Sequence, residues 1–133
     1  MNITLKELKT NDVIQSNELK IRETESTKSK KTTHYLGVSQ GKEVAFVSID
    51  RWPELDQFVL YELYIPKSLR RKGVGKLVLT EIEFIAKKEG FHSVKLKPHP
   101  LDSDINERDL IAWYQYLGYC QDTSANGDLI KKI

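Results

Sequence analysis

Cysteine is nearly absent from this chain, in which Cys120 is the only one. A single cysteine excludes an internal disulfide and any metal site built from several cysteines. Because no base stands beside it in the sequence, Cys120 is interpreted as a small apolar residue rather than as a nucleophile. The three histidines, His34, His92 and His99, lack the spacing of a zinc site, so the sequence predicts no bound metal.

Long apolar runs and an excess of charge are also missing. No segment approaches the roughly 18 apolar residues of a membrane span, and residues 1–15 lack the apolar core of a signal peptide. We therefore expect a cytoplasmic protein without a membrane partner. Lys and Arg number 21 against 19 Asp and Glu, which leaves a net charge of +2. So small an excess creates no strong field to attract nucleic acid, and none is expected as a partner.

The order of the expected elements indicates one α+β domain over residues 1–133. With 39% hydrophobic residues, the chain can bury a single core. A strand, a helix and a second strand in succession imply a parallel pair, so the sheet should be mixed. The expected elements are a hairpin within 33–52, a strand at 58–65, a helix at 73–89, a strand at 93–97, a helix at 106–118 and two short strands around an Asn126-Gly127 turn. Residues 25–33 are polar and are expected to form a mobile loop between strands.

The segment RRKGVG, residues 70–75, places three cations and two glycines where a strand leads into a helix. Backbone amides at a helix N-terminus, flanked by cations and free of Cβ atoms, form an anion site. A Walker phosphate loop is excluded because Leu77 stands where that motif needs Ser or Thr. The dinucleotide fingerprint is excluded because Val78 stands where it needs a small residue.

What remains resembles the GNAT superfamily of acyl-CoA-dependent N-acyltransferases, over residues 58–119. LYIPKSLRRKGVGKLVL is similar to the family's strand, loop and helix signature, and LIAWYQYLGY is similar to its second signature. The resemblance implies a GNAT-like fold, a mostly antiparallel sheet flanked by helices, in which a parallel strand-helix-strand unit holds the coenzyme A loop. It also implies acetyl-CoA as cosubstrate and transfer of the acetyl group to an amine.

Carried onto this sequence, the resemblance assigns the coenzyme A contacts to one strand end and one loop. The amides of residues 71–76 would take the pyrophosphate, and Gly73 and Gly75 have no Cβ to obstruct it. Arg70 would either hold the loop or add charge. The strand edge at 63–65 would pair with the pantetheine amides. The residues expected to bind the cosubstrate are Leu63, Tyr64, Ile65, Arg70, Arg71, Lys72, Gly73, Val74, Gly75 and Lys76.

Two residues are candidates for catalysis. Glu62 is the acid inside the apolar strand, where family members often carry a base or a water-orienting acid; its alternative is a structural carboxylate. Tyr114 stands at the family's tyrosine, four residues before Gly118, and would donate to the departing sulfur. A phenol, with a pKa near 10, carries its proton at neutral pH, whereas a thiol has a reference pKa of about 8.5. Packing at the rim is the alternative for Tyr114.

The resemblance is incomplete in two places. Family members usually have more chain before the third strand, including helices that wall the acceptor site, whereas about 30 residues precede residue 33 here. The acceptor pocket is therefore expected to be open, or to be completed by another subunit in a homodimer. The second signature commonly opens with Asn, but Glu107 holds that place and Asn106 comes one residue earlier. A role for Asn106 is left open.

Three functions are compatible with these patterns. The first is an N-acetyltransferase acting on a primary amine of a small molecule or peptide by direct attack in a ternary complex. The second is a non-catalytic coenzyme A-binding or regulatory module of the same fold, which would bind coenzyme A and release none from its thioester. The third is nucleic-acid binding through residues 28–31 and 70–73, which predicts steeply salt-dependent DNA affinity and which the near-neutral charge argues against.

Overall fold

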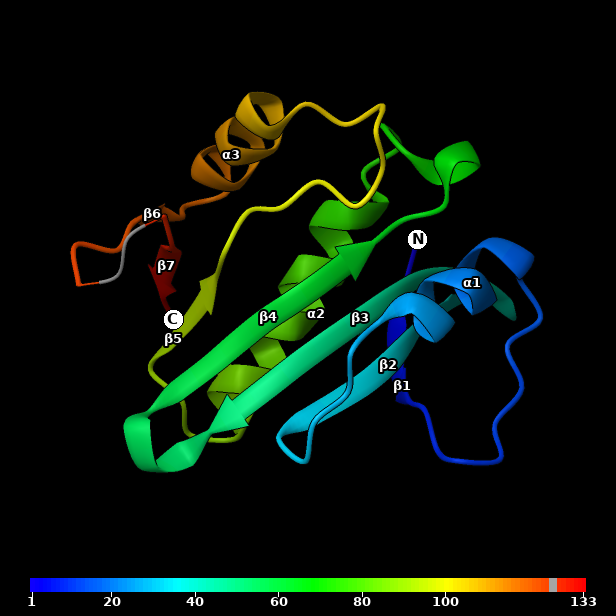
Figure 1. Ribbon diagram of the computed structural model, residues 1–133, viewed down its shortest axis with the longest axis horizontal. Coiled ribbons are helices and arrows are strands. Elements are labelled where there is room, and N and C mark those ends of the chain that lie inside the picture. Colours follow the sequence, from blue (N-terminus) through cyan, green and yellow to red (C-terminus); the bar gives the residue numbers. More distant parts are fainter. Residues whose placement is uncertain (125–126) are drawn as a thin grey trace.

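A seven-stranded mixed sheet dominates the computed structural model, which describes residues 1–124 and 127–133. The strands lie in the order β1-β2-β3-β4-β5-β7-β6 (Figure 1), and only β4 and β5 pair in parallel within this part of the chain. The expected α+β class with a mostly antiparallel sheet is therefore confirmed. The strands are β1 Thr4–Glu7, β2 Thr32–Ser39, β3 Lys42–Trp52, β4 Gln57–Tyr64, β5 Ser93–Leu96, β6 Cys120–Gln121 and β7 Leu129–Lys132.

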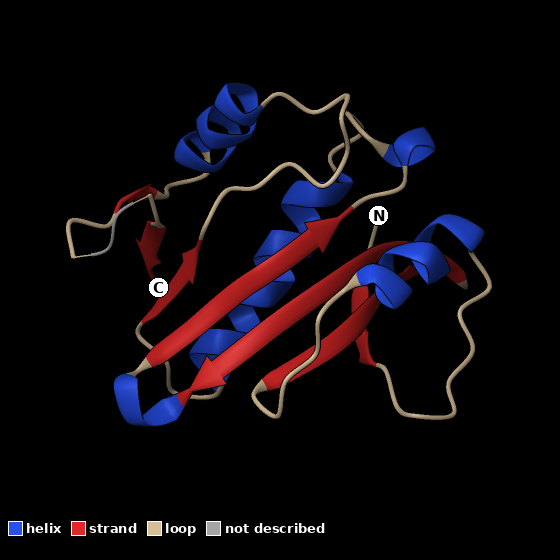
Figure 2. Cartoon of the chain, viewed as in Figure 1, coloured by secondary structure: helices blue, strands red, loops and turns tan. Residues whose placement is uncertain are grey.

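Helices cover both faces of the sheet. The helices are α1 Asn17–Glu25, α2 Val74–Lys88 and α3 Glu107–Tyr116, with 3-10 turns at Pro53–Leu55 and Lys67–Leu69. In Figures 1 and 2, α1 lies in front of the sheet and α2 behind it. Two apolar clusters match this arrangement: a large one joins the sheet to α2 and α3, and a small one, around Leu19 and Phe46, joins it to α1. None of the helices in the described ranges is long and apolar enough to cross a membrane.

A β-bulge in β4 decides which side chains face α1. Ser48 of β3 pairs with Glu62 and Ile49 pairs with Leu60, which leaves Tyr61 as an extra residue in β4. An extra residue shifts the alternation of side chains between the two faces. Leu60 therefore joins the core under α2, whereas Glu62 reaches Arg22 of α1.

The helix after the glycines begins and ends close to the expected residues. Gly73, with φ 81°, is the N-cap of α2, and the last turn closes on Gly90, with φ 91°. At that end the amide of Phe91 donates to the carbonyl of Ala86 and the amide of Gly90 to that of Lys87, the pattern of a glycine-terminated helix. Helix α2 thus spans 74–88 where 73–89 was expected.

The N-terminal third contains two elements that the sequence did not indicate, strand β1 and helix α1. Residues 25–33 consequently connect a helix to a strand, not two strands. The helix α1 is capped by Ser16, whose side chain accepts from the amide of Leu19. At the other end of the chain β6 and β7 are antiparallel, as expected, while the first residue of the Asn126-Gly127 turn lies outside the described residues.

Candidate active site

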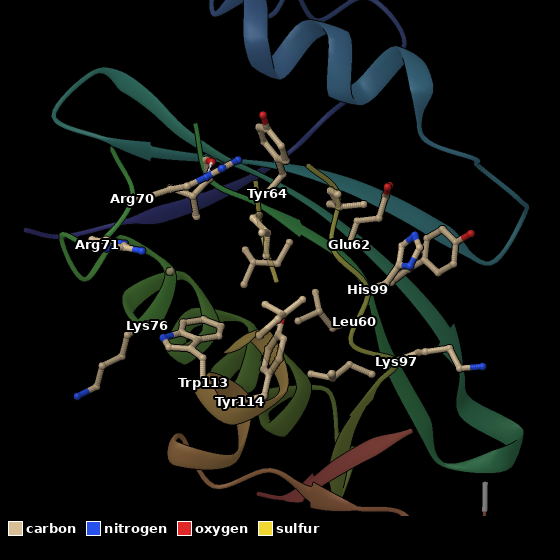
Figure 3. A pocket seen from close by; sticks show the side chains of 18 of the residues that line it. Leu60, Glu62, Tyr64, Arg70, Arg71, Lys76, Lys97, His99, Trp113 and Tyr114 are labelled. Carbon is tan, nitrogen blue, oxygen red and sulfur yellow. Dashed lines mark hydrogen bonds between the residues drawn. The ribbon is translucent and has the colours of Figure 1, made fainter. Parts of the chain in front are cut away.

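A cleft opens where β4 and β5 separate. The two strands pair only from Phe58 to Leu60 within the described residues, so the rest of β4 has a free edge toward β5. A cavity of about 230 Å³ lies there and extends from the glycine loop to α3. Figure 3 shows Tyr64 and Arg70 on one side of this cleft and Trp113 and Tyr114 on the other. The cavity also meets Glu62, so both candidate catalytic residues line one space.

The loop between β4 and α2 offers a row of free amides. From Arg71 to Lys76 the backbone N–H groups form no hydrogen bond with the described part of the chain. Arg71, with φ 61°, and Gly73, with φ 81°, are both left-handed, and such turns point successive amides to one side. Because α2 begins here, its dipole adds positive potential. The arrangement suits an anion such as a pyrophosphate.

The two glycines of the loop are required for different reasons. A Cβ on Gly73 would meet nothing within 4 Å, so its left-handed backbone is what favours glycine. A Cβ on Gly75 would lie 3.2 Å from the ring of Trp113. Gly75 therefore lets α3 pack closely on the start of α2 and brings Trp113 to the cleft.

Arg70 holds the loop in place. Its Nε donates to the carbonyl of Ile65 at 2.8 Å, its guanidinium pairs with Asp102, and Nη1 lies 3.5 Å from Asp104. Burial would raise the pKa of Asp102, but hydrogen bonds from Arg70 and Tyr64 outweigh it and hold that pKa below its usual range. With its charge balanced by carboxylates, Arg70 fits the loop-holding alternative better than phosphate binding.

Tyr64 belongs to the same network. Its hydroxyl lies 2.7 Å from Glu18 and 3.1 Å from Asp102, and it can donate to one of them at a time. Burial, followed by these two acceptors, raises the pKa of Tyr64, so the phenol stays protonated. Tyr64 thereby ties α1 and the 98–105 loop to β4, and its ring forms a wall of the cleft.

The other expected cosubstrate residues divide into those that meet the cleft and those that do not. Arg71 and Lys76 line it from the loop and the start of α2, with the Lys76 side chain extending outward in Figure 3, and Leu63 and Ile65 line it from β4. Lys72 is exposed outside the cavity, and the side chain of Val74 is buried in the core. Residues 72 and 74 can contribute only their backbone amides at this position.

Tyr114 reaches the cleft from a helix fixed on the core. Its ring packs edge-on against Trp113 and Tyr119, at 4.9 and 5.7 Å between ring centroids, and it is 6% exposed. Its hydroxyl donates to no group in the described part of the chain. Burial raises the pKa of Tyr114, so the phenol keeps its proton at neutral pH. Asn106, whose role the sequence left open, caps this helix by accepting from the amides of Arg108 and Asp109.

Glu62 stands between the cleft and a second cavity. That cavity, of about 500 Å³, shares with the first the residues Leu60, Tyr61, Glu62, Lys97, His99 and Leu101, and α1 lines it through Arg22 and Glu25. The carboxylate of Glu62 accepts from Ser26 and lies 3.4 Å from the guanidinium of Arg22. These two partners satisfy hydrogen-bonding capacity that a buried carboxylate would otherwise lose.

Sequence reasoning missed Arg22 and Ser26 as parts of this site. Both belong to the N-terminal segment, which showed no element from which a position could be derived. The available signal was Ser16 followed by Glu18, a capping residue with an acid in the first turn of a helix. A correct prediction of α1 would still not have revealed its contact with Glu62, because that contact depends on the bulge in β4.

The chain's relatives share its sequence family and its fold. The sequence pattern of the Acetyltransferase (GNAT) family matches residues 5–119. The chain belongs to this family. No curated protein sequence is similar enough to this GNAT chain to count as a match.

Solved structures share the GNAT fold. A GNAT family acetyltransferase from Elizabethkingia anophelis with acetyl-CoA bound is 14% identical with a TM-score of 0.70, and 99% of each chain is covered. The ribosomal-protein-S18-alanine N-acetyltransferase from Escherichia coli is 17% identical with a TM-score of 0.66, covering 98% of this chain and 94% of that one. The PaiA N-acetyltransferase from Thermoplasma acidophilum, in complex with coenzyme A, is 22% identical with a TM-score of 0.59. There 77% of this chain aligns with 62% of that one, so the chain spans less than two thirds of this relative.

Proposed function

We propose that this GNAT chain is an acetyl-CoA-dependent N-acetyltransferase that acts on a primary amine of a small molecule or peptide. The observation that carries the proposal is one cavity lined by the glycine loop, Glu62 and Tyr114. An anion-binding loop, an acid and a phenol are the groups that acyl transfer from a thioester to an amine needs. The relatives with bound coenzyme A or acetyl-CoA support the choice of cosubstrate.

The residues present fit an acyl-CoA. Six free amides and the cations Arg71 and Lys76 suit the pyrophosphate. The free edge of β4 after Leu60 suits the amide groups of the pantetheine arm, as a strand edge suits an added peptide. When bound, acetyl-CoA supplies an activated thioester, so no covalent intermediate with the chain is needed.

Glu62 is assigned the role of base. An amine is protonated at neutral pH and must lose a proton before its nitrogen can attack the thioester carbonyl. Glu62 lies where the two cavities meet, so an amine in the larger one can approach the thioester past this carboxylate. The larger cavity, with Arg22, Glu25 and Lys97 among its lining, is proposed to hold the acceptor.

Tyr114 is assigned the role of donor to the leaving group. The attack places a negative charge first on the carbonyl oxygen and then on the sulfur as the C–S bond breaks. The Tyr114 hydroxyl lines the cleft with its proton in place, and Trp113 and Tyr119 hold its ring. Donation of that proton or a hydrogen bond to the thiolate completes the reaction, and the second proton, which the nitrogen loses after the attack, restores the phenol.

The experiment that tests the proposal combines ligand binding with an amine screen. Acetyl-CoA should raise the Tm, because a ligand that binds only the native state stabilises it, whereas ATP and NAD should raise it far less. A panel of small amines and peptides is then incubated with acetyl-CoA, and free coenzyme A is measured. We expect release with a subset of amines. Binding of acetyl-CoA without release for any amine would replace the enzyme by the coenzyme A-binding module.

A further inference from the structure

A row of polar side chains crosses the sheet beneath α1. In the strand register His34 of β2 pairs with Ser48 of β3, and Ser48 pairs with Glu62 of β4. His34 is 3% and Glu62 8% exposed, and the Ser48 hydroxyl is buried without a partner in the described residues. A buried polar group without a hydrogen-bond partner lowers the stability of the fold, so its presence calls for an explanation such as a functional role. This row interrupts an otherwise apolar face that includes Leu36 and Phe46.

Ser26 connects the two ends of this row. It is the C-cap of α1, and its hydroxyl donates to the Glu62 carboxylate while lying 3.4 Å from Nε2 of His34. The other ring nitrogen of His34, Nδ1, lies 3.8 Å from the carboxylate of Glu23. Glu62, Ser26, His34 and Glu23 therefore lie in a row of groups that can exchange protons. The step of 3.8 Å from His34 to Glu23 is longer than a hydrogen bond, so a proton crosses it when the two side chains approach each other.

The chain of groups joins two separate cavities. Glu62 lines the cleft and the larger cavity proposed for the acceptor. His34 and Glu23 line a third cavity of about 130 Å³ beside Lys28, and none of its lining residues lines the other two. Glu23 is 41% exposed, so a proton that reaches it can pass to solvent.

We propose that Ser26 and His34 carry the proton that Glu62 takes from the acceptor amine to the far side of α1. This proposal rests on the proposed function. In it, Ser26 and His34 act through Glu62: they pass on the proton that Glu62 has taken. The need for a path follows from the site itself: a cosubstrate in the cleft and an acceptor in the larger cavity cover Glu62 from both sides. A Glu62 that keeps its proton cannot accept the next one.

The proton leaves Glu62 in two steps. The Glu62 carboxyl gives its proton to the Ser26 oxygen while the Ser26 hydroxyl proton passes to Nε2 of His34, which leaves Glu62 ionised and His34 an imidazolium. The imidazolium then releases its Nδ1 proton to Glu23 and to solvent, and the ring returns from the Nε2–H to the Nδ1–H tautomer by proton exchange before the next turnover. Burial and then Lys28 lower the pKa of His34, against the opposing charges of Glu23 and Glu62, so the ring is neutral at rest and releases the proton readily.

The kinetic test removes one hydroxyl. Ser26→Ala, assayed with acetyl-CoA and the amine that releases coenzyme A fastest, should lower kcat on the order of tenfold while both KM values stay unchanged. Ser26→Thr should restore kcat because it keeps the hydroxyl. Ser48→Ala is the matched control, because it deletes a buried hydroxyl of the same row outside the path. Full kcat in Ser26→Ala, or an equal loss in Ser48→Ala, would overturn the proposal.

A second measurement does not depend on turnover. The exit path requires neutral His34 to carry its proton on Nδ1, leaving Nε2 free to accept from Ser26, and nitrogen NMR of the imidazole distinguishes the two tautomers. The Nδ1–H form supports the path, and the Nε2–H form overturns it. A wild-type chain that releases no coenzyme A with any amine would instead contradict the proposed function, whichever tautomer is found.

Discussion

The two parts of the site, one proposed for the cosubstrate and one for the acceptor, offer different groups for binding. At the cosubstrate end the groups on offer are backbone ones, the amides of 71–76 and the free edge of β4, while side chains such as Arg70 and Tyr64 serve to hold the loop. At the acceptor end the strands are paired and the groups on offer are side chains, with Glu62 at their centre. Substitutions that preserve shape should therefore leave cosubstrate binding unchanged, whereas removal of a reacting group such as the Glu62 carboxylate should impair turnover.

The largest effect is expected at the acceptor end, for Glu62→Gln. The amide keeps the size of the side chain and can still accept from Ser26, but it cannot take a proton. We expect kcat/KM to fall by about 10²-fold or more, with the acidic limb of the pH–rate profile removed or shifted. Acetyl-CoA binding, measured by calorimetry, should be unchanged. An active variant with the wild-type profile would return Glu62 to a structural role.

Next is the loss of binding expected at the cosubstrate end for Gly73→Val. The left-handed backbone at residue 73 disfavours a β-branched side chain, so the turn that aligns the amides should be lost. Acetyl-CoA at 100 times its wild-type Kd, worth about 2.7 kcal/mol, should no longer raise the Tm. Gly41→Val is the control, because Gly41 is also left-handed, at φ 76°, and lies in the β2–β3 turn. Equal binding by both variants would place the pyrophosphate elsewhere.

Tyr114→Phe tests whether a hydroxyl matters where the ring is already fixed by its neighbours. We expect acyl transfer to slow on the order of tenfold, with acetyl-CoA affinity unchanged, because only the donor is removed. Single-turnover kinetics should be used so that product release does not hide the change. Tyr116→Phe, on the same helix and 83% exposed, should have no effect. Full turnover in the Tyr114 variant would require another donor or water.

A smaller effect separates two lysines of the loop. Lys76 lines the cleft and Lys72 does not, although both are exposed. We expect Lys76→Ala to weaken acetyl-CoA binding about two- to fivefold at low salt, an ordinary value for exposed charges, and Lys72→Ala to leave it unchanged. Added salt should reduce the difference. Equal losses in the two variants would mean that the loop acts through its overall charge.

The smallest effect is the pH dependence of the free energy of unfolding that His34 produces. Folding lowers the pKa of His34 below its usual 6.5, through burial and Lys28 and despite Glu23 and Glu62, so the unfolded chain binds this proton more readily. The free energy of unfolding should therefore fall as the pH drops below about 6.5, and the His34→Gln variant should show a weaker fall. Denaturant titrations of both proteins from pH 7.5 to 5 measure the difference. Identical slopes would contradict a lowered pKa.

The strand, loop and helix proposed to bind the cosubstrate could be located from the sequence because their signals are local. The glycines, the strand before them and the helix after them lie within about 30 residues, and each follows from its own residues. The acceptor end could not be predicted because it is assembled from distant segments. Ser26, His34 and Glu62 meet only through strand register and the bulge at Tyr61.

Helix α1 shows the same limit in another way. It has nine residues, of which only Leu19 is buried, so it lacks the apolar stripe by which a helix is recognised. Its position is fixed by contacts that come from elsewhere, including the hydrogen bond from Tyr64 to Glu18 and the one from the amide of Ser16 to Glu43. The two glycines of the loop can be singled out in the sequence, but the contact of Gly75 with Trp113 follows only from the packing of α3.

The most direct test of the central claim, acetyl transfer in this cleft, is the stoichiometry of a single reaction. Wild-type protein, acetyl-CoA and an amine selected by the screen are incubated, and free coenzyme A and the N-acetylated amine are both quantified by mass spectrometry. We predict equal amounts of the two products, and neither product above background with Glu62→Gln over the same interval. Release of coenzyme A without acetylated amine, or equal yields from the wild type and the variant, would contradict the account.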